Sequence, residues 1–131
     1  YTMPERSGAL DRPFPVWRWR DGAWDQPFCI ARIGTFLAVD ADFGPDGRFY
    51  LLERDFWGLL GFRSRVRVFD IDGDTISAGQ ILFETSAGTN DNLEGLDVWR
   101  DRQGFIRLTM ISDDNMRFFQ RTEIVEYRVV P

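Results

Sequence analysis

The sequence predicts an all-β fold, and within that class a β-propeller fragment of about two and a half four-stranded blades. Two segments are rough copies of one another: an apolar strand, a turn with Asp and Gly, and a second apolar strand that ends in carboxylates. Aligning Asp42 with Asp97 gives a period of 97 − 42 = 55 residues. A period of this length that contains only strands and turns is typical of propeller blades.

Residues 1–33 are expected to form the last part of one blade. Residues 1–6 have the pattern of the end of a strand. Residues 16–20 alternate apolar and charged side chains, as a half-exposed strand does, and the pair Asp21 and Gly22 predicts a tight hairpin turn. The next blade is expected to begin directly after this segment.

Residues 34–88 predict a complete blade. The turn at 44–47 contains Pro, Asp and Gly in an order that favours a reversal of the chain. Residues 48–53 include four consecutive apolar residues, which fits a strand packed on both faces. An apolar loop or short helical turn, interrupted by glycines, is expected at 56–62. Further strands are expected at 65–71 and 75–85.

Residues 89–131 predict a second, nearly complete blade. Propellers close with roughly four to eight blades, so the chain is not expected to close a ring by itself. We expect the missing blades to come from another segment of the parent protein or from a second copy of the chain. The apolar side chains expected to be partly exposed in such an open ring are Phe49, Leu51, Leu108 and Met110.

The composition excludes several kinds of chemistry. All 16 basic side chains are arginine, and neither lysine nor histidine occurs, so the chain alone cannot form a Ser-His-Asp triad, a Cys-His pair or a Schiff base. The net charge of −5 argues against nucleic-acid binding. The single cysteine, Cys29, excludes an internal disulfide and is expected to be buried. No apolar run is long enough to span a bilayer, and the start at Tyr1 suggests a processed product or a fragment.

Acidic side chains gather at the strand ends of both copies. Because neighbouring strands are antiparallel, the loop that enters the first strand and the loop that leaves the second lie at the same end of a sheet. This places residues 90–94 beside residues 112–115. In the preceding copy it places Asp40 and Asp42 near residues 53–55. Oxygen ligands that converge on one rim suit Ca²⁺ or Mg²⁺ better than zinc.

The carboxylates of the second copy have two open interpretations. In the first, they bind a calcium ion, since clustered carboxylates repel one another unless a cation or an arginine neutralises them. In the second, Asp and Asn side chains cap turns, as they do in most β-proteins. The expected metal ligands of the first interpretation are Asp91, Asn92, Glu94, Asp113 and Asp114.

Tryptophan is frequent in this chain, with 5 among 131 residues. We expect these side chains to be buried between blades, where large rings supply much of a core's contact area. The alternative is that they line a binding groove. The residues concerned are Trp17, Trp19, Trp24, Trp57 and Trp99.

Four segments, residues 1–6, 41–54, 91–96 and 108–115, resemble proteins of one bacterial family. Together they are similar to the phytase-like proteins, a family also called "esterase-like activity of phytase". The similarity covers essentially the whole chain, and it matches only the C-terminal half of a family member. The resemblance implies a β-propeller, export to the periplasm or out of the cell, and hydrolysis of phosphate or carboxylic esters. It also implies calcium held by carboxylates, with basic residues that bind phosphate.

The favoured hypothesis is a metal-assisted hydrolase that acts on a small-molecule ester or phosphoester. Calcium would lower the pKa of a bound water and neutralise substrate oxygens. Asp113, Glu94 and Arg54 are the expected catalytic residues. Arg54 or Arg117, near the same rim, is expected to bind phosphate bidentately. The alternative is a non-catalytic propeller that binds a ligand or a protein at its mouth, with any metal purely structural.

Overall fold

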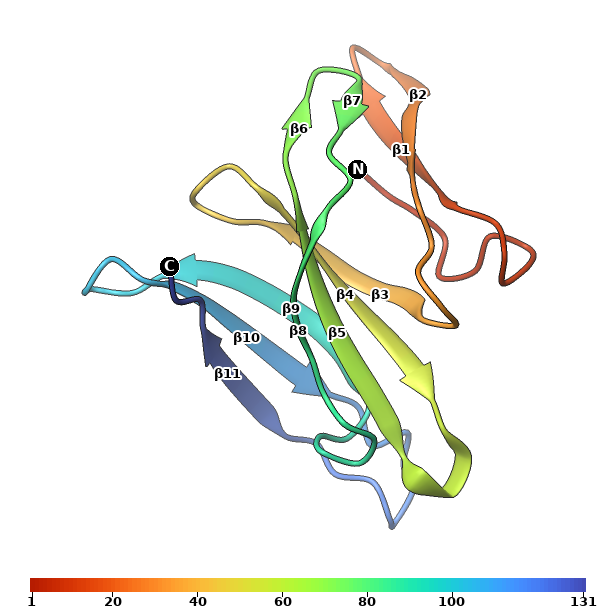
Figure 1. Ribbon diagram of the computed structural model, residues 1–131, viewed down its shortest axis with the longest axis vertical. Coiled ribbons are helices and arrows are strands. Elements are labelled where there is room, and N and C mark those ends of the chain that lie inside the picture. The colour runs from red at the N-terminus through yellow and green to blue at the C-terminus, as the bar shows by residue number, and fades with distance from the viewer.

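The computed structural model describes residues 1–131 and contains strands, loops and one short 3₁₀ turn, with no α-helix. Figure 1 shows three antiparallel sheets and a small hairpin: the first sheet (β1–β2), the middle sheet (β3–β4–β5–β8), the third sheet (β9–β10–β11) and the β6–β7 hairpin. No helix is long and apolar enough to cross a bilayer. The elements are β1 (Phe14–Arg20), β2 (Ala23–Ile30), β3 (Leu37–Phe43), β4 (Phe49–Phe56), η1 (Gly58–Leu60), β5 (Phe62–Phe69), β6 (Ile71–Asp72), β7 (Thr75–Ile76), β8 (Gln80–Glu84), β9 (Leu93–Arg100), β10 (Ile106–Ser112) and β11 (Ile124–Arg128).

The hairpin of the first sheet forms where its turn residues predict it. Asp21 and Gly22 both have positive φ, at 53° and 82°, which matches the twist that a two-residue turn between antiparallel strands requires. The N-terminal segment adds a further pairing to this sheet, because Thr2 and Trp17 exchange backbone hydrogen bonds of 2.8 Å. The prediction of a strand, a tight turn and a second strand is therefore confirmed.

The repeat is real, but its period is two residues longer than the sequence alignment gives. The two strand-connecting turns close with equivalent hydrogen bonds, in which Gly47 N–H donates to Gly44 O and Gly104 N–H donates to Asp101 O. Equating these turns gives a period of 101 − 44 = 57 residues. Asp97 therefore corresponds to Asp40. A shift of two residues keeps every side chain on the same face of its strand, so the apolar pattern alone could not detect it.

An apolar core joins the middle sheet to the third sheet. All its members are at most 9% exposed, and side chains of β8 and β11 pack around them. Because alternate residues of a strand point to one face, the core takes every second position of its strands, except at the start of β9, where the register shifts by one residue. The core residues are Tyr50, Leu52, Val66 and Val68 from the middle sheet, and Leu93, Leu96, Val98, Leu108 and Met110 from the third sheet.

The opposite face of the middle sheet packs on the first sheet. Phe14, Val16 and Ile30 of the first sheet cover Phe49 and Leu51. The prediction that the apolar faces are partly bared to water is therefore wrong. Each face lies against a neighbouring sheet of the same chain, and the four side chains concerned are at most 2% exposed, namely Phe49, Leu51, Leu108 and Met110.

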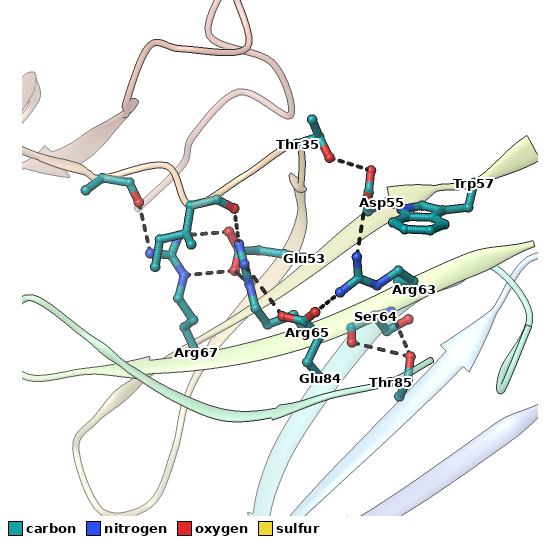
Figure 2. A network of polar contacts seen from close by, with 12 residues as sticks. Thr35, Glu53, Asp55, Trp57, Arg63, Ser64, Arg65, Arg67, Glu84 and Thr85 are labelled. Carbon is teal, nitrogen blue, oxygen red and sulfur yellow. Dashed lines mark hydrogen bonds and ion pairs between the residues drawn. The ribbon is translucent and has the colours of Figure 1, made fainter. Parts of the chain in front are cut away.

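A charged cluster is buried on this same face, as Figure 2 shows. Glu53 accepts hydrogen bonds of 2.8 Å from both Arg65 and Arg67. The two guanidinium groups also donate to the backbone oxygens of Ile33 and Ala31, which follow the first sheet. The alternation of arginine and valine in β5 suggests a half-exposed strand, but both sides of the strand are buried because the first sheet covers the arginine side.

Two carboxylates connect the edges of β3 and β9. Asp40 and Asp42 accept the backbone N–H groups of Leu96 and Val98, at 2.7 and 2.8 Å, and their second oxygens accept the N–H of the following residue. The prediction that both aspartates lie near residues 53–55 holds only for Asp40, which pairs with Leu52, whereas Asp42 pairs with Tyr50 further along the strand. Their role is to satisfy backbone donors that no neighbouring strand pairs.

The burial predicted for the tryptophans and for Cys29 is wrong. All five indoles are between 38% and 56% exposed, and the cysteine is exposed too. The sheets are joined by aliphatic side chains, phenylalanines and Tyr50 instead. Several exposed tryptophans lie on strand faces that point away from the middle sheet, among them Trp17, Trp19 and Trp99.

Candidate functional site

The strand ends of the middle and third sheets meet at one end of the molecule. Leu37 pairs with Arg54 at the start of β3, and Leu93 pairs with Ser112 at the start of β9. The loops before β9 and after β10 are joined by a 3.0 Å hydrogen bond from Asp113 N–H to Asn92 O. The prediction that residues 90–94 lie beside residues 112–115 is therefore confirmed.

An open cavity of about 1180 Å³ lies at this end, and we call it the mouth cavity. It is lined by side chains from the N-terminal segment, from β3, β4 and β5, and from the loops that flank the third sheet. Its lining includes basic, acidic and apolar side chains. Its lining residues are Arg6, Leu10, Thr35, Leu37, Arg54, Asp55, Phe56, Trp57, Phe62, Asn92, Glu94, Asn115, Arg117 and Gln120.

Arg54 is the most heavily bonded side chain of the mouth cavity. Its Nη1 donates to the side-chain oxygen of Asn92 and, at 2.6 Å, to Glu94 Oε1, while Nη2 donates to Glu5 Oε1 at 2.8 Å. Asn92 is buried and donates from its amide to the same Glu94 oxygen at 2.7 Å. This network fixes Glu94 and neutralises it. Arg54 is therefore a positioning residue for Glu94 in this arrangement.

Three polar groups of the mouth cavity have no partner. Arg6 and Arg117 are exposed, and neither guanidinium makes a side-chain hydrogen bond or an ion pair. Arg117 lies only near an aromatic ring, 5.9 Å from the centroid of Phe119. The second oxygen of Glu94, Oε2, accepts no hydrogen bond. The cavity therefore offers two free cationic groups and one free carboxylate oxygen to a ligand.

A second, smaller cavity of about 540 Å³ adjoins the mouth cavity through Arg54 and Glu94, which line both. It runs along β3 and the N-terminal segment. All four of its carboxylates are bonded within the chain, since Asp40 and Asp42 accept N–H groups of β9 and both Glu5 and Glu94 pair with Arg54. This smaller cavity therefore offers a ligand few carboxylate oxygens that are not already bonded within the chain.

The predicted metal ligands do not assemble into an oxygen cage. Asp91 accepts the backbone N–H groups of Asn92 and Arg121, Asp113 accepts that of Asn115, and Asp114 accepts that of Met116. No three His, Cys, Asp or Glu side chains lie close enough together to hold a metal ion. This is the arrangement that turn capping produces, and it does not fit calcium. Calcium binding stays a prediction.

The predicted catalytic residues separate into two groups. Glu94 and Arg54 lie together in the mouth cavity, and Arg117 lies in it too. Asp113 is exposed and outside the lining, with its carboxylate turned to Asn115 N–H. Sequence reasoning missed Arg6 as a candidate site residue, because it belongs to a segment outside any strand that only the tertiary fold brings to the cavity.

The clearest pKa shifts lie away from the mouth cavity. The hydrogen bond from Arg18 holds the pKa of Asp25 below its usual value. Partial burial opposes ionisation of Asp101, but hydrogen bonds from Arg107 and from backbone N–H groups outweigh it, and its pKa is lowered as well. Asp101 lies in the turn at the opposite end of β9. Asp25 and Asp101 therefore contribute to the stability of the fold and not to the mouth cavity.

Comparison with known proteins gives one match. The model of a family described as "Phytase-like: Esterase-like activity of phytase" matches residues 1–116. The chain matches no curated protein and no solved structure.

Proposed function

The chain belongs to the phytase-like family described by the esterase-like activity of phytase, and on this premise we propose that it hydrolyses anionic esters in the mouth cavity. The observation that carries the proposal is the pair of unpartnered guanidinium groups, Arg6 and Arg117, in the cavity that also holds Glu94. Guanidinium groups bind phosphate and carboxylate oxygens bidentately, so the two arginines supply the affinity for a substrate anion.

The free oxygen of Glu94 supplies the base. Water attacks the phosphorus or carbonyl carbon of the ester, and its proton passes to Glu94 Oε2. The bond between the attacked phosphorus or carbonyl carbon and the leaving oxygen breaks, and the leaving oxygen takes the proton from Glu94, so that one ester and one water give one acid and one alcohol and Glu94 is restored. Arg54 and Asn92 hold Glu94 in position through Oε1.

Turnover of small chromogenic esters tests this proposal. We expect the chain to release nitrophenol from 4-nitrophenyl phosphate, whose anionic group the arginines can bind. The variant Glu94→Gln should lower kcat about 10²-fold or more, because general-base catalysis typically contributes that much. Arg117→Ala and Arg6→Ala should mainly raise KM. The matched control is Arg102→Ala, which removes an exposed arginine in the turn at the other end of the third sheet.

The same assay separates this proposal from the calcium hypothesis. Addition of EDTA, or the variant Asp113→Ala, should leave the rate unchanged, since the acidic side chains cap turns in this arrangement. A rate abolished by EDTA and by Asp113→Ala would instead support calcium-assisted hydrolysis. Equal rates for the wild type and Glu94→Gln would contradict the role of Glu94.

A non-catalytic ligand-binding module is the second candidate. The observation that favours it is the pairing of Arg54 and of Glu94 Oε1 within the chain, which leaves few groups free for chemistry. This candidate predicts that the mouth cavity binds phosphate, and that binding weakens in Arg117→Ala, without turnover of any ester. Calorimetry with inorganic phosphate beside the ester assay distinguishes the two functions.

We further propose that the three sheets are successive propeller blades, within residues 1–33, 34–88 and 89–131. The face-to-face packing of the sheets and the adjacent strands β3 and β9 support this arrangement. We propose that the remaining blades come from another segment of the parent protein or from a second copy, and that the protein is exported. Light scattering tests the second copy: a dimer or larger species is expected, and a monomer at micromolar concentration would contradict it.

A further inference from the structure

We propose that the mouth cavity selects esters that join an aromatic group to the anionic group, an inference that rests on the proposed function. The lining of the cavity includes arginines and also three aromatic rings that we call the aromatic wall: Phe56, Trp57 and Phe62. Phytate-type substrates, which have phosphate groups and no aromatic ring, would leave this wall in contact with water.

Trp57 is exposed but held in place. Its indole N–H donates a 2.6 Å hydrogen bond to Asp55 Oδ2, and Asp55 in turn accepts a 3.0 Å hydrogen bond from Thr35. The Arg63 guanidinium lies 5.0 Å from the ring centroid. Figure 2 shows these residues as one network that continues to Glu84. The indole remains 49% exposed, so a fixed aromatic surface is available to a ligand at little further cost in side-chain entropy.

Phe56 and Phe62 complete the aromatic wall, and Phe62 lies near Arg54. Phe56 is 64% exposed and packs on Phe62 with ring centroids 5.1 Å apart. The Arg54 guanidinium, which holds Glu94, lies 5.7 Å from the centroid of the Phe62 ring, so the aromatic wall lies beside the Arg54–Glu94 pair. A ligand of matching chemistry has an aromatic ring on one side and an anionic group on the other.

Calorimetry with phosphonates tests the inference without turnover, because a carbon–phosphorus bond is not an ester. The ligands are methylphosphonate, phenylphosphonate and 1-naphthylphosphonate, which share the anionic group and differ in ring size. A ligand ring that packs on the aromatic wall gains a favourable ring–ring arrangement in addition to the burial of apolar area. We therefore expect 1-naphthylphosphonate to bind roughly tenfold more tightly than methylphosphonate, with phenylphosphonate between them.

Variants of the aromatic wall identify the surface responsible. Trp57→Ala and Phe56→Ala should each reduce the naphthyl preference severalfold while leaving methylphosphonate affinity unchanged. Two variants are used because loss of the indole also removes the bond to Asp55, whereas Phe56 makes no hydrogen bond through its side chain. The matched control is Trp99→Ala, which removes an exposed indole of β9 that does not line the cavity.

The outcomes separate this inference from the proposed function. Equal affinity for the three phosphonates, with normal dependence on Arg117, would overturn the aromatic selection and leave anion binding intact. A naphthyl preference that persists in both wall variants would also overturn it. No binding of any phosphonate would overturn the proposed function together with this inference.

Discussion

Two groups of arginines differ in the environment of their guanidinium groups. In the interior, Arg65 and Arg67 are at most 2% exposed, and both are bonded to Glu53 and to backbone oxygens. In the mouth cavity, Arg6 and Arg117 are exposed, and their guanidinium groups have no hydrogen-bonding partner. The interior group joins the middle sheet to the chain that leaves the first sheet, and the mouth group is free to bind an anion.

The difference shows that residue type alone does not identify a functional arginine. A buried guanidinium must be paired and hydrogen bonded within the fold, because leaving it unpaired is costly. An exposed and unpaired guanidinium contributes little to stability and keeps its donors for a ligand. Loss of an interior partner should therefore change stability, whereas loss of a mouth arginine should change binding.

The largest effect on stability is expected from Glu53→Ala. This change leaves two buried guanidinium groups without their carboxylate, and breaking a buried ion pair in this way typically costs about 3–5 kcal/mol. The free energy of unfolding, measured with urea by circular dichroism, should fall by that amount. A loss below about 1 kcal/mol would contradict a structural role for the cluster.

A triple variant serves as the control for that prediction. Replacing Glu53 by Leu and both Arg65 and Arg67 by Met removes the charges together and keeps the space filled. Apolar replacement of buried ion pairs is often neutral or stabilising. We expect the triple variant to be much more stable than Glu53→Ala, and an equally large loss would indicate that packing, not charge, determines the effect.

The next largest effect is expected on the apolar side of the same strand. Leu52 is fully buried between the middle and third sheets, so Leu52→Ala should lower the free energy of unfolding by roughly 3 kcal/mol. The cause is lost apolar contact and a cavity. The same urea experiment measures it, and phosphonate binding at the mouth cavity should persist under native conditions. A loss below about 1 kcal/mol would contradict this packing.

A smaller effect is expected from the carboxylates that hold β9. Asp40→Ala leaves the N–H of Leu96 without its acceptor and should cost about 1–3 kcal/mol. Asp97 occupies the equivalent repeat position, is exposed and has no such partner, so Asp97→Ala should change stability by less than about 0.5 kcal/mol. Equal losses in both variants would contradict the proposed role of Asp40.

The smallest effect is a dependence on acid pH. The folded-state pKa values of Asp25 and Asp101 are lowered, so their contribution is fully present above the ordinary value of about 4 and is lost as the pH falls further. Urea midpoints should therefore decrease below about pH 4. Arg18→Met removes the main cause of the Asp25 shift and should make this decrease shallower. An unchanged slope would contradict the pairing.

Sequence patterns predicted the local fold well because turns and strand alternation are local properties. The Asp21 and Gly22 turn and the strand that follows residues 44–47 formed as expected. Burial was harder to predict, because it depends on which neighbouring sheet covers a face. Alternation with valine in β5 does not reveal that Arg65 is buried, and the tryptophans, which were expected to be core residues, are exposed.

The candidate site was predicted in part for the same reason. The strand ends that carry Glu94, Arg54 and Arg117 meet because antiparallel topology requires it. The three aspartates among the expected calcium ligands accept backbone N–H groups, which composition cannot reveal. Arg6 belongs to a segment whose path depends on tertiary packing, so no sequence pattern predicted that it lies in the cavity.

The most direct test of the comparison is NMR of arginine side chains during a titration with phenylphosphonate. The Nε–H signals are assigned by single Arg→Lys variants. We predict saturable shifts for Arg6 and Arg117 and no shift for Arg65 and Arg67. Unmoved Arg6 and Arg117 signals, or equal shifts at the remote Arg102, would contradict the claim that the free mouth arginines form the anion site.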